Sequence, residues 1–146
     1  MNYEIVVLEE KTIVGVSAGT GNQDPQMSKI IGGLWEKLFQ EDVYPAIKNK
    51  ENAYAIGLYS DYSEDSYLVT AGVEVSAAEN PELTTKVIPA GKYAKFIMEG
   101  EMETIVAEAW EQIWQENLDR TFTGDFEEYL NHDAANAKIA IYIAIK

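Results

Sequence analysis

The chain has 146 residues, a length typical of one domain with its own hydrophobic core. Eleven Lys and Arg against 25 Asp and Glu give a net charge of −14, which repels nucleic acid and anionic lipid. With no cysteine there are no disulfides or thiolate sites, and His132 is the single histidine. We therefore expect no cofactor, no metal, and no direct nucleic acid or membrane partner.

The N-terminal segment has no basic leader, and no apolar run reaches the roughly 18 residues that a membrane span needs. We therefore expect a soluble, cytoplasmic protein. Aromatic residues make up 11% of the chain, which favours a packed domain over a disordered acidic segment.

In the first half of the chain, β-branched and aromatic residues predict four strands with one amphipathic helix between the second and third. The pair Asp24-Pro25 is typical of a helix start, and Pro45 should end the helix. The strands are expected at residues 3–8, 12–19, 54–59 and 67–76.

The second half repeats this order. A helix should follow Gly100, where Glu101 and Glu103 favour the positive end of the helix dipole. The strands are expected at residues 83–88, 92–98, 126–131 and 138–145.

The two helices are copies of one another at an offset of 75 residues. Ile31–Glu41 (IGGLWEKLFQE) aligns with Val106–Glu116 (VAEAWEQIWQE), and Trp35 matches Trp110. Two tyrosine pairs have the same offset, which predicts that their members occupy equivalent strand positions: Tyr54 with Tyr129, and Tyr67 with Tyr142.

These patterns predict an α+β fold. We expect a single domain over residues 1–146 that contains a tandem ββαββ repeat, with halves at about 1–77 and 78–146 related by a pseudo-twofold axis. The halves should join their edges into an eight-stranded antiparallel sheet with two long helices. A groove should lie between the two modules.

The last two strands can be registered from the loop between their expected ends at residues 131 and 138, which contains HDAAN and centres near position 134.5. This register puts Phe126 opposite Ile143 on the face that packs against the helices. Glu127 then lies opposite Tyr142 on the other face, next to Tyr129, and its counterpart in the first half is Asn52. A slip of one residue would exchange Glu127 and Glu128.

A carboxylate among tyrosines suits an organic cation, because charge attraction adds to cation–π contacts of about 0.5–2 kcal/mol per ring. The alternative is an exposed Glu that merely lies beside a Tyr, and core packing is the ordinary role of a Trp on an apolar helix stripe. The candidate ligand-binding residues are Glu127, Tyr142, Tyr129, Tyr54, Trp110 and Trp35.

The repeated ββαββ order, the Trp in each helix and the late segment DFEEYLNH followed by a final strand resemble the GyrI-like effector-binding domain. This family is similar to the ligand-binding part of AraC- and MerR-type multidrug-responsive regulators and to stand-alone integron cassette proteins. The resemblance implies that Glu127, within Phe126-Glu127-Glu128-Tyr129, recognises cationic lipophilic compounds together with Tyr142. Those regulators carry a separate DNA-binding segment, so we expect a stand-alone module that acts in transcription regulation or drug sequestration.

Three alternatives remain from the resemblance. Some GyrI-like proteins resemble hydrolases of cyclopropane-containing compounds, in which Glu127 would act as acid or base. Gyrase-inhibitor members suggest a protein partner for the acidic surface. Haem binding is disfavoured because His132 lies in a predicted turn.

Overall fold

A computed structural model describes residues 2–77, 79–131 and 133–146, so His132 lies outside the described residues. The strands are β1 (Glu4–Leu8), β2 (Lys11–Thr20), β3 (Lys50–Ser60), β4 (Tyr67–Val75), β5 (Thr84–Ile88), β6 (Gly91–Gly100), β7 (Asp125–Tyr129) and β8 (Ala137–Ile145). The helices are α1 (Met27–Gln40), α2 (Val43–Ala46) and α3 (Met102–Gln115). The short α2, which contains Pro45, was not expected from the sequence.

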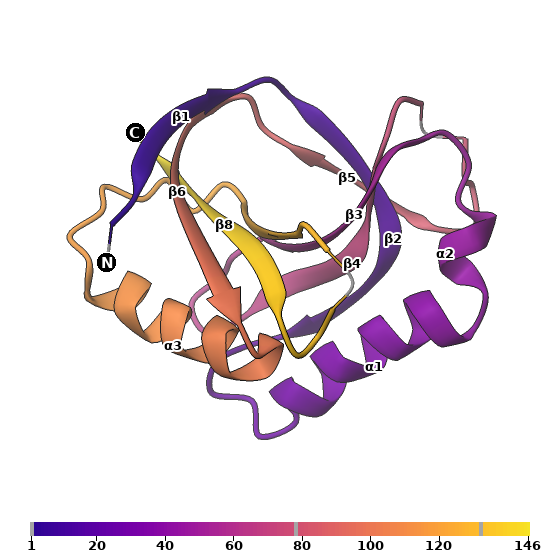
Figure 1. Cartoon of the computed structure of the whole chain (residues 1–146). Helices are drawn as coiled ribbons and strands as arrows, with labels where there is room; N and C mark the ends of the chain where they lie inside the picture. Colours follow the sequence, from indigo (N-terminus) through magenta and orange to yellow (C-terminus); the bar gives the residue numbers. More distant parts are fainter. Residues whose placement is uncertain (1, 78, 132) are drawn as a thin grey trace.

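The strands form one eight-stranded antiparallel sheet in the order β1-β6-β8-β7-β3-β4-β2-β5 (Figure 1). The predicted α+β fold with a tandem ββαββ repeat is therefore confirmed. The two halves meet at the centre, where β3 pairs with β7, and they exchange their first strands. β1 pairs with β6 of the second half, and β5 pairs with β2 of the first half.

The offset of 75 residues holds for the helices and not for the strands. β2 and β6 are 80 residues apart, whereas β4 and β8 are 70 apart. Six residues join β2 to α1, but Glu101 alone joins β6 to α3. After the helices, β3 begins five residues before the part that pairs with β7. The predicted equivalence of Tyr54 with Tyr129 and of Tyr67 with Tyr142 is therefore wrong.

The strand bounds give a different set of equivalent positions. Residues 55–59 of β3 correspond to residues 125–129 of β7, 70 positions later. Tyr59 is therefore the counterpart of Tyr129, and Gly57, rather than Asn52, is the counterpart of Glu127.

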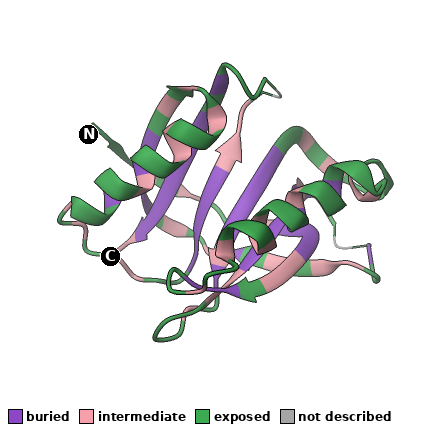
Figure 2. Ribbon diagram, turned by 90° about the horizontal axis from the view of Figure 1, so that it is seen from below, coloured by how far each residue is buried: buried purple, intermediate pink, exposed green. Residues whose placement is uncertain are grey.

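Both long helices pack on the same face of the curled sheet, with their exposed sides turned outward (Figure 2). Leu34 and Leu38 of α1 pack on the strands of the first half, and Ala109 and Ile113 of α3 pack on those of the second. No helix in the described part of the chain is both long and apolar enough to cross a membrane.

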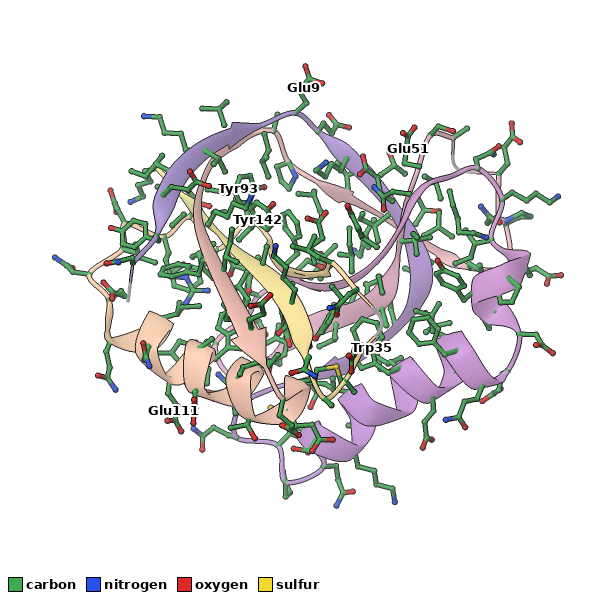
Figure 3. All side chains as sticks on the ribbon, in the orientation of Figure 1. Glu9, Trp35, Glu51, Tyr93, Glu111 and Tyr142 are labelled. Carbon is green, nitrogen blue, oxygen red and sulfur yellow. The ribbon has the colours of Figure 1, made fainter. Side chains whose placement is uncertain are left out.

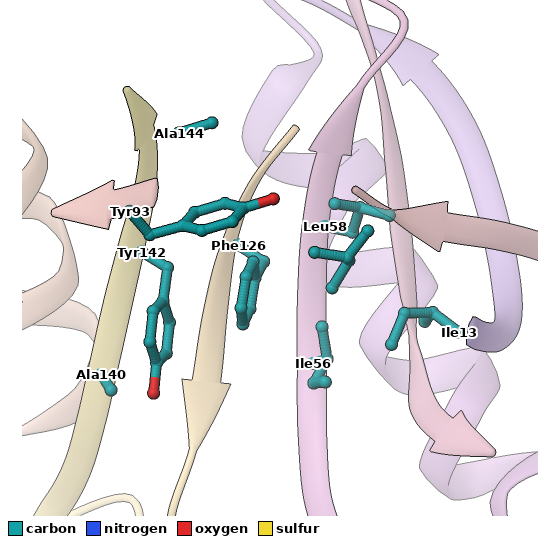
Figure 4. Packing of buried hydrophobic residues seen from close by; sticks show 9 residues of the cluster. Ile13, Ile56, Leu58, Tyr93, Phe126, Ala140, Tyr142 and Ala144 are labelled. Atoms are coloured by element: carbon teal, nitrogen blue, oxygen red, sulfur yellow. The ribbon is translucent and has the colours of Figure 1, made fainter. Parts of the chain in front are cut away.

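The opposite face of the sheet curls around a second hydrophobic core. Its large side chains include Tyr93, Phe126 and Tyr142, and the Phe126 and Tyr142 rings stack 4.5 Å apart (Figure 4). Gly15 and Gly72 are paired in β2 and β4, where a Cβ on either would lie about 2 Å from a backbone carbonyl oxygen of the other strand. This close approach allows the sheet to curl.

The predicted register of β7 and β8 is wrong by one residue. Glu127 pairs with Ile141 and not with Tyr142, and Tyr142 pairs with Phe126. The observed pairs are centred on Ala134, half a residue before the expected centre, because β8 begins at Ala137, one residue earlier than expected. The Asn131 side chain closes the loop by donating to the Asn136 carbonyl and accepting from the Lys138 amide. Glu127 therefore lies on the face that carries the helices, while Phe126 and Tyr142 lie on the other face.

Candidate functional site

The groove predicted between the two modules is present as a cleft between α1, α3 and the sheet. Its cavity has a volume of about 1320 Å³ and is lined by both helices, by Tyr59 and Tyr129, by the loop at residues 62–67, and by Arg120 and Phe122. A smaller cavity of about 330 Å³ adjoins it and shares Trp35 and Tyr129 as walls. In Figure 3, Trp35 lies between α1 and the sheet, whereas Tyr142 lies inside the curl.

Glu127 is 2% exposed and lies directly behind the wall of this cleft, where it contacts three of the residues that line it. Its Oε2 accepts hydrogen bonds from the Tyr59 hydroxyl at 3.0 Å and from the Trp110 indole N–H at 2.7 Å. Its Oε1 accepts from the Tyr129 hydroxyl at 2.7 Å. All three donors are neutral, and no Lys or Arg in the described residues forms an ion pair with this carboxylate.

Burial dominates the electrostatics of this carboxylate. It raises the pKa of Glu127, and the hydrogen bonds from Tyr129, Trp110 and Tyr59 lower that pKa only in part. Burial and the adjacent carboxylate also raise the pKa values of Tyr59 and Tyr129 well above the ordinary phenol value. The two hydroxyls therefore remain neutral donors at physiological pH.

The aromatic rings around Glu127 follow the pseudo-twofold axis. Trp35 of the first half meets Tyr129 of the second edge to face at 5.2 Å, and Trp110 of the second half meets Tyr59 of the first at 5.4 Å. Each half thus contributes one Trp and one Tyr in an exchanged arrangement.

The carboxylate itself breaks this symmetry, because its counterpart is Gly57. A Cβ at Gly57 would lie 3.1 Å from Cζ2 of Trp35 and 3.2 Å from Oε1 of Glu127. The missing side chain on β3 therefore leaves room for the Trp35 indole and for the single Glu127 carboxylate.

A second buried carboxylate, Asp125, lies two residues before Glu127 on the same face. It accepts hydrogen bonds from the Arg120 guanidinium and the Tyr62 hydroxyl, both at 2.6 Å, and from the Ala144 amide at 2.9 Å. Unlike Glu127, it has a full cationic partner.

The structure brings four of the six candidates together: Tyr129, Trp110 and Trp35 line the cleft, and Glu127 lies directly behind them. Tyr142 lies on the opposite face, where its hydroxyl is 3.5 Å from Glu128. Tyr54 is 39% exposed and does not line the cleft. Both placements correct the sequence interpretation, because the register and the offset were misassigned.

Sequence reasoning missed Tyr59, which donates to Glu127, together with the aromatic residues Tyr62 and Tyr67. The 70-residue offset of the strands would have paired Tyr59 with Tyr129, but this offset cannot be read from the helices. In the part of the chain that the structure describes, no group of three or more Asp, Glu, His or Cys residues is arranged to hold a metal ion.

Comparisons with known proteins agree with this architecture. Residues 4–145 match the Cass2 family, described as integron-associated effector binding protein. The chain is 33% identical to YobU of Bacillus subtilis, a proposed transcriptional regulator, with 97% of this chain and 96% of YobU aligned.

Two solved structures share the fold over nearly the whole chain. An integron cassette protein of Vibrio cholerae is 26% identical with a TM-score of 0.82, covering 99% of this chain and 95% of its own. The protein SAV2435, in a structure bound to tetraphenylphosphonium, is 20% identical with a TM-score of 0.84, covering 100% of this chain and 94% of its own.

Proposed function

We propose that this chain, which belongs to the Cass2 family of integron-associated effector binding proteins, binds hydrophobic cationic small molecules in the cleft between α1 and α3. Glu127 is the anionic centre of this site, and the two Trp–Tyr pairs form its walls. Such binding would serve either transcription regulation through a partner or sequestration of the compound.

The observation that carries this proposal is the unbalanced charge of Glu127. Removing a carboxylate from water costs several kcal/mol unless a cation and good hydrogen bonds compensate. Tyr59, Trp110 and Tyr129 supply hydrogen bonds but no positive charge. A cationic ligand would supply that charge. Its attraction to Glu127 would be strong because no cationic side chain of the described protein already neutralises this carboxylate.

The surroundings of Glu127 add selectivity for aromatic or lipophilic cations. Trp35, Trp110, Tyr59 and Tyr129 line the cleft, and their ring faces attract cations by about 0.5–2 kcal/mol each. A hydrophilic inorganic cation would lose its hydration shell there without gaining comparable contacts. The net charge of −14 also concentrates cations near the protein.

Tetraphenylphosphonium is a suitable probe, because it is a permanent lipophilic cation and is bound in the SAV2435 structure of the same fold. The test is its affinity for the parent protein and for Glu127→Gln, measured by calorimetry at neutral pH. The glutamine amide can still accept from Tyr59 and Trp110 and can donate to the Tyr129 oxygen, so the variant should fold. We expect an affinity loss of about 10- to 100-fold.

Glu128→Gln is the matched control, because it makes the same change one residue away on the opposite face of the sheet. Its tetraphenylphosphonium affinity should equal that of the parent. Equal losses in both variants would indicate a general charge effect, and an unchanged affinity in Glu127→Gln would refute the site.

A further inference from the structure

Arg120 lies in the segment between α3 and β7 and lines the same cleft. Its Nη2 donates to Asp125 at 2.6 Å, and its guanidinium lies 4.3 Å from the centroid of the Phe122 ring. Its Nε is buried without a hydrogen-bond partner among the described residues. A guanidinium has five N–H donors, and only one of those of Arg120 donates to a side chain of the described residues.

A continuous series of rings joins Glu127 to Arg120. Tyr59, which donates to Glu127, meets Tyr67 edge to face at 5.5 Å, and Tyr67 meets Tyr62 at 6.0 Å. Tyr62 in turn meets Phe122, which covers the Arg120 guanidinium, at 5.7 Å. The wall of the cleft is therefore aromatic from the carboxylate to the guanidinium.

The strand sets the spacing of the two buried carboxylates. Asp125 holds Arg120, and it is two residues from Glu127 on the same face of β7, which corresponds to about 6–7 Å along the strand. Arg120 is therefore held next to the strand and face that carry Glu127.

The backbone conformation of Phe122 indicates that specific contacts hold Arg120 in its position. Phe122 has a φ of 57°, in the left-handed region that bulky residues rarely adopt. This conformation is maintained where its ring contacts both Arg120 and Tyr62. Unfavourable backbone conformations persist where the surrounding contacts hold them, often at ligand sites.

We propose that Arg120 is a second recognition point of the cleft, one that donates hydrogen bonds to an acceptor group on the ligand. This inference rests on the proposed function and narrows its ligand class to aromatic cations that also carry an ester or carboxylate. Glu127 binds the cation, and Arg120 binds the acceptor.

Three dyes with one chromophore separate the two contributions. Tetramethylrosamine is a cation without an acceptor, tetramethylrhodamine methyl ester adds an ester, and tetramethylrhodamine adds a carboxylate. Fluorescence anisotropy gives the affinity of each dye for the parent, and we expect the ester to bind about five- to tenfold more tightly than rosamine.

Arg120→Lys keeps a positive charge beside Asp125 but removes the planar fork of donors. We expect the ester-to-rosamine affinity ratio to fall to about twofold or less. The double variant Arg120→Gln with Asp125→Asn replaces the ion pair by a neutral pair and should reduce the ratio equally. This second variant tests the inference if the lysine variant fails to fold.

The outcomes distinguish this inference from the proposed function. Rosamine binding that depends on Glu127, combined with no preference for the ester in the parent, would overturn the role of Arg120 and leave the cation site intact. A preference that survives in both Arg120 variants would overturn it as well. If rosamine does not bind the parent at all, the cation site fails and the acceptor site fails with it.

Discussion

Asp125 and Glu127 are two buried carboxylates on one strand and one face of the sheet, yet their environments differ in charge balance. Asp125 has the Arg120 guanidinium at 2.6 Å, while Glu127 has only the neutral donors of Tyr59, Trp110 and Tyr129. The first carboxylate is charge-balanced by the protein itself, and this ion pair holds the segment before β7 on the sheet. The second has its hydrogen bonds but lacks a countercharge, which is the condition for binding a cation.

The largest expected effect comes from breaking the ion pair of Asp125 with Arg120. Asp125→Ala leaves the Arg120 guanidinium without its carboxylate and should lower the free energy of unfolding by about 3 kcal/mol. Urea denaturation measures this loss. Asp119→Ala is the control, because its 3.5 Å ion pair with Lys146 is exposed and should be worth less than about 1 kcal/mol. Equal losses in the two variants would contradict the structural role of Asp125.

Glu127→Gln should instead raise the free energy of unfolding at pH values where the Glu127 carboxyl of the parent is ionised. Burial raises the folded-state pKa of Glu127 above its ordinary value of 4.5, so the folded protein binds this proton more tightly than the unfolded chain does. The carboxyl therefore contributes stability below about pH 4.5 that is lost as the pH rises through the folded-state pKa.

The measurement is the difference in unfolding free energy between Glu127→Gln and the parent at a series of pH values. This difference should increase in favour of the variant as the pH rises through that window, and should then stay constant. A parent that gains stability relative to the variant over the same window would show that the carboxylate is already compensated.

The smallest expected effect concerns the hydroxyls around Glu127. Tyr59→Phe and Tyr129→Phe each remove one hydrogen bond to the carboxylate, which raises its pKa further. Because only the ionised form attracts a cation, tetraphenylphosphonium affinity should fall about threefold near neutral pH, and its decline on acidification should begin at a higher pH.

Tyr142→Phe is the control for these hydroxyl variants, because its hydroxyl lies near Glu128 on the other face. Its affinity and its pH profile should match those of the parent. A shifted profile in Tyr142→Phe would favour the register expected from the sequence over the observed one.

The sequence was sufficient for the architecture and for part of the site. The aligned helices with Trp35 and Trp110 predicted the repeat, and closing two modules edge to edge predicted the eight-stranded sheet and its groove. The motif singled out Glu127, which lies directly behind the cleft wall and accepts hydrogen bonds from three residues that line it, while its role in binding stays a prediction. These features depend on helix periodicity and strand composition, which are local properties.

The predictions that were wrong concern features that depend on the lengths of loops and on where strands begin. The register of β7 and β8 differs by one residue from the expected one because β8 begins at Ala137, which moves the centre of the hairpin by half a residue and places Tyr142 on the other face. Tyr59 was missed because the connector before α1 is five residues longer than that before α3, and because β3 begins five residues before the part that pairs with β7. The pairing of Asp125 with Arg120 involves a segment without regular structure, for which no periodic pattern exists.

The exchange of first strands between the halves has a consequence for folding. β1 must find β6, so that Glu4 pairs with Lys95, and β5 must find β2 before either outer part of the sheet is complete. Contacts between residues this distant in sequence slow folding, because a long loop must close before they form. The chain therefore assembles its two halves together, and the cleft between them exists only once both are in place.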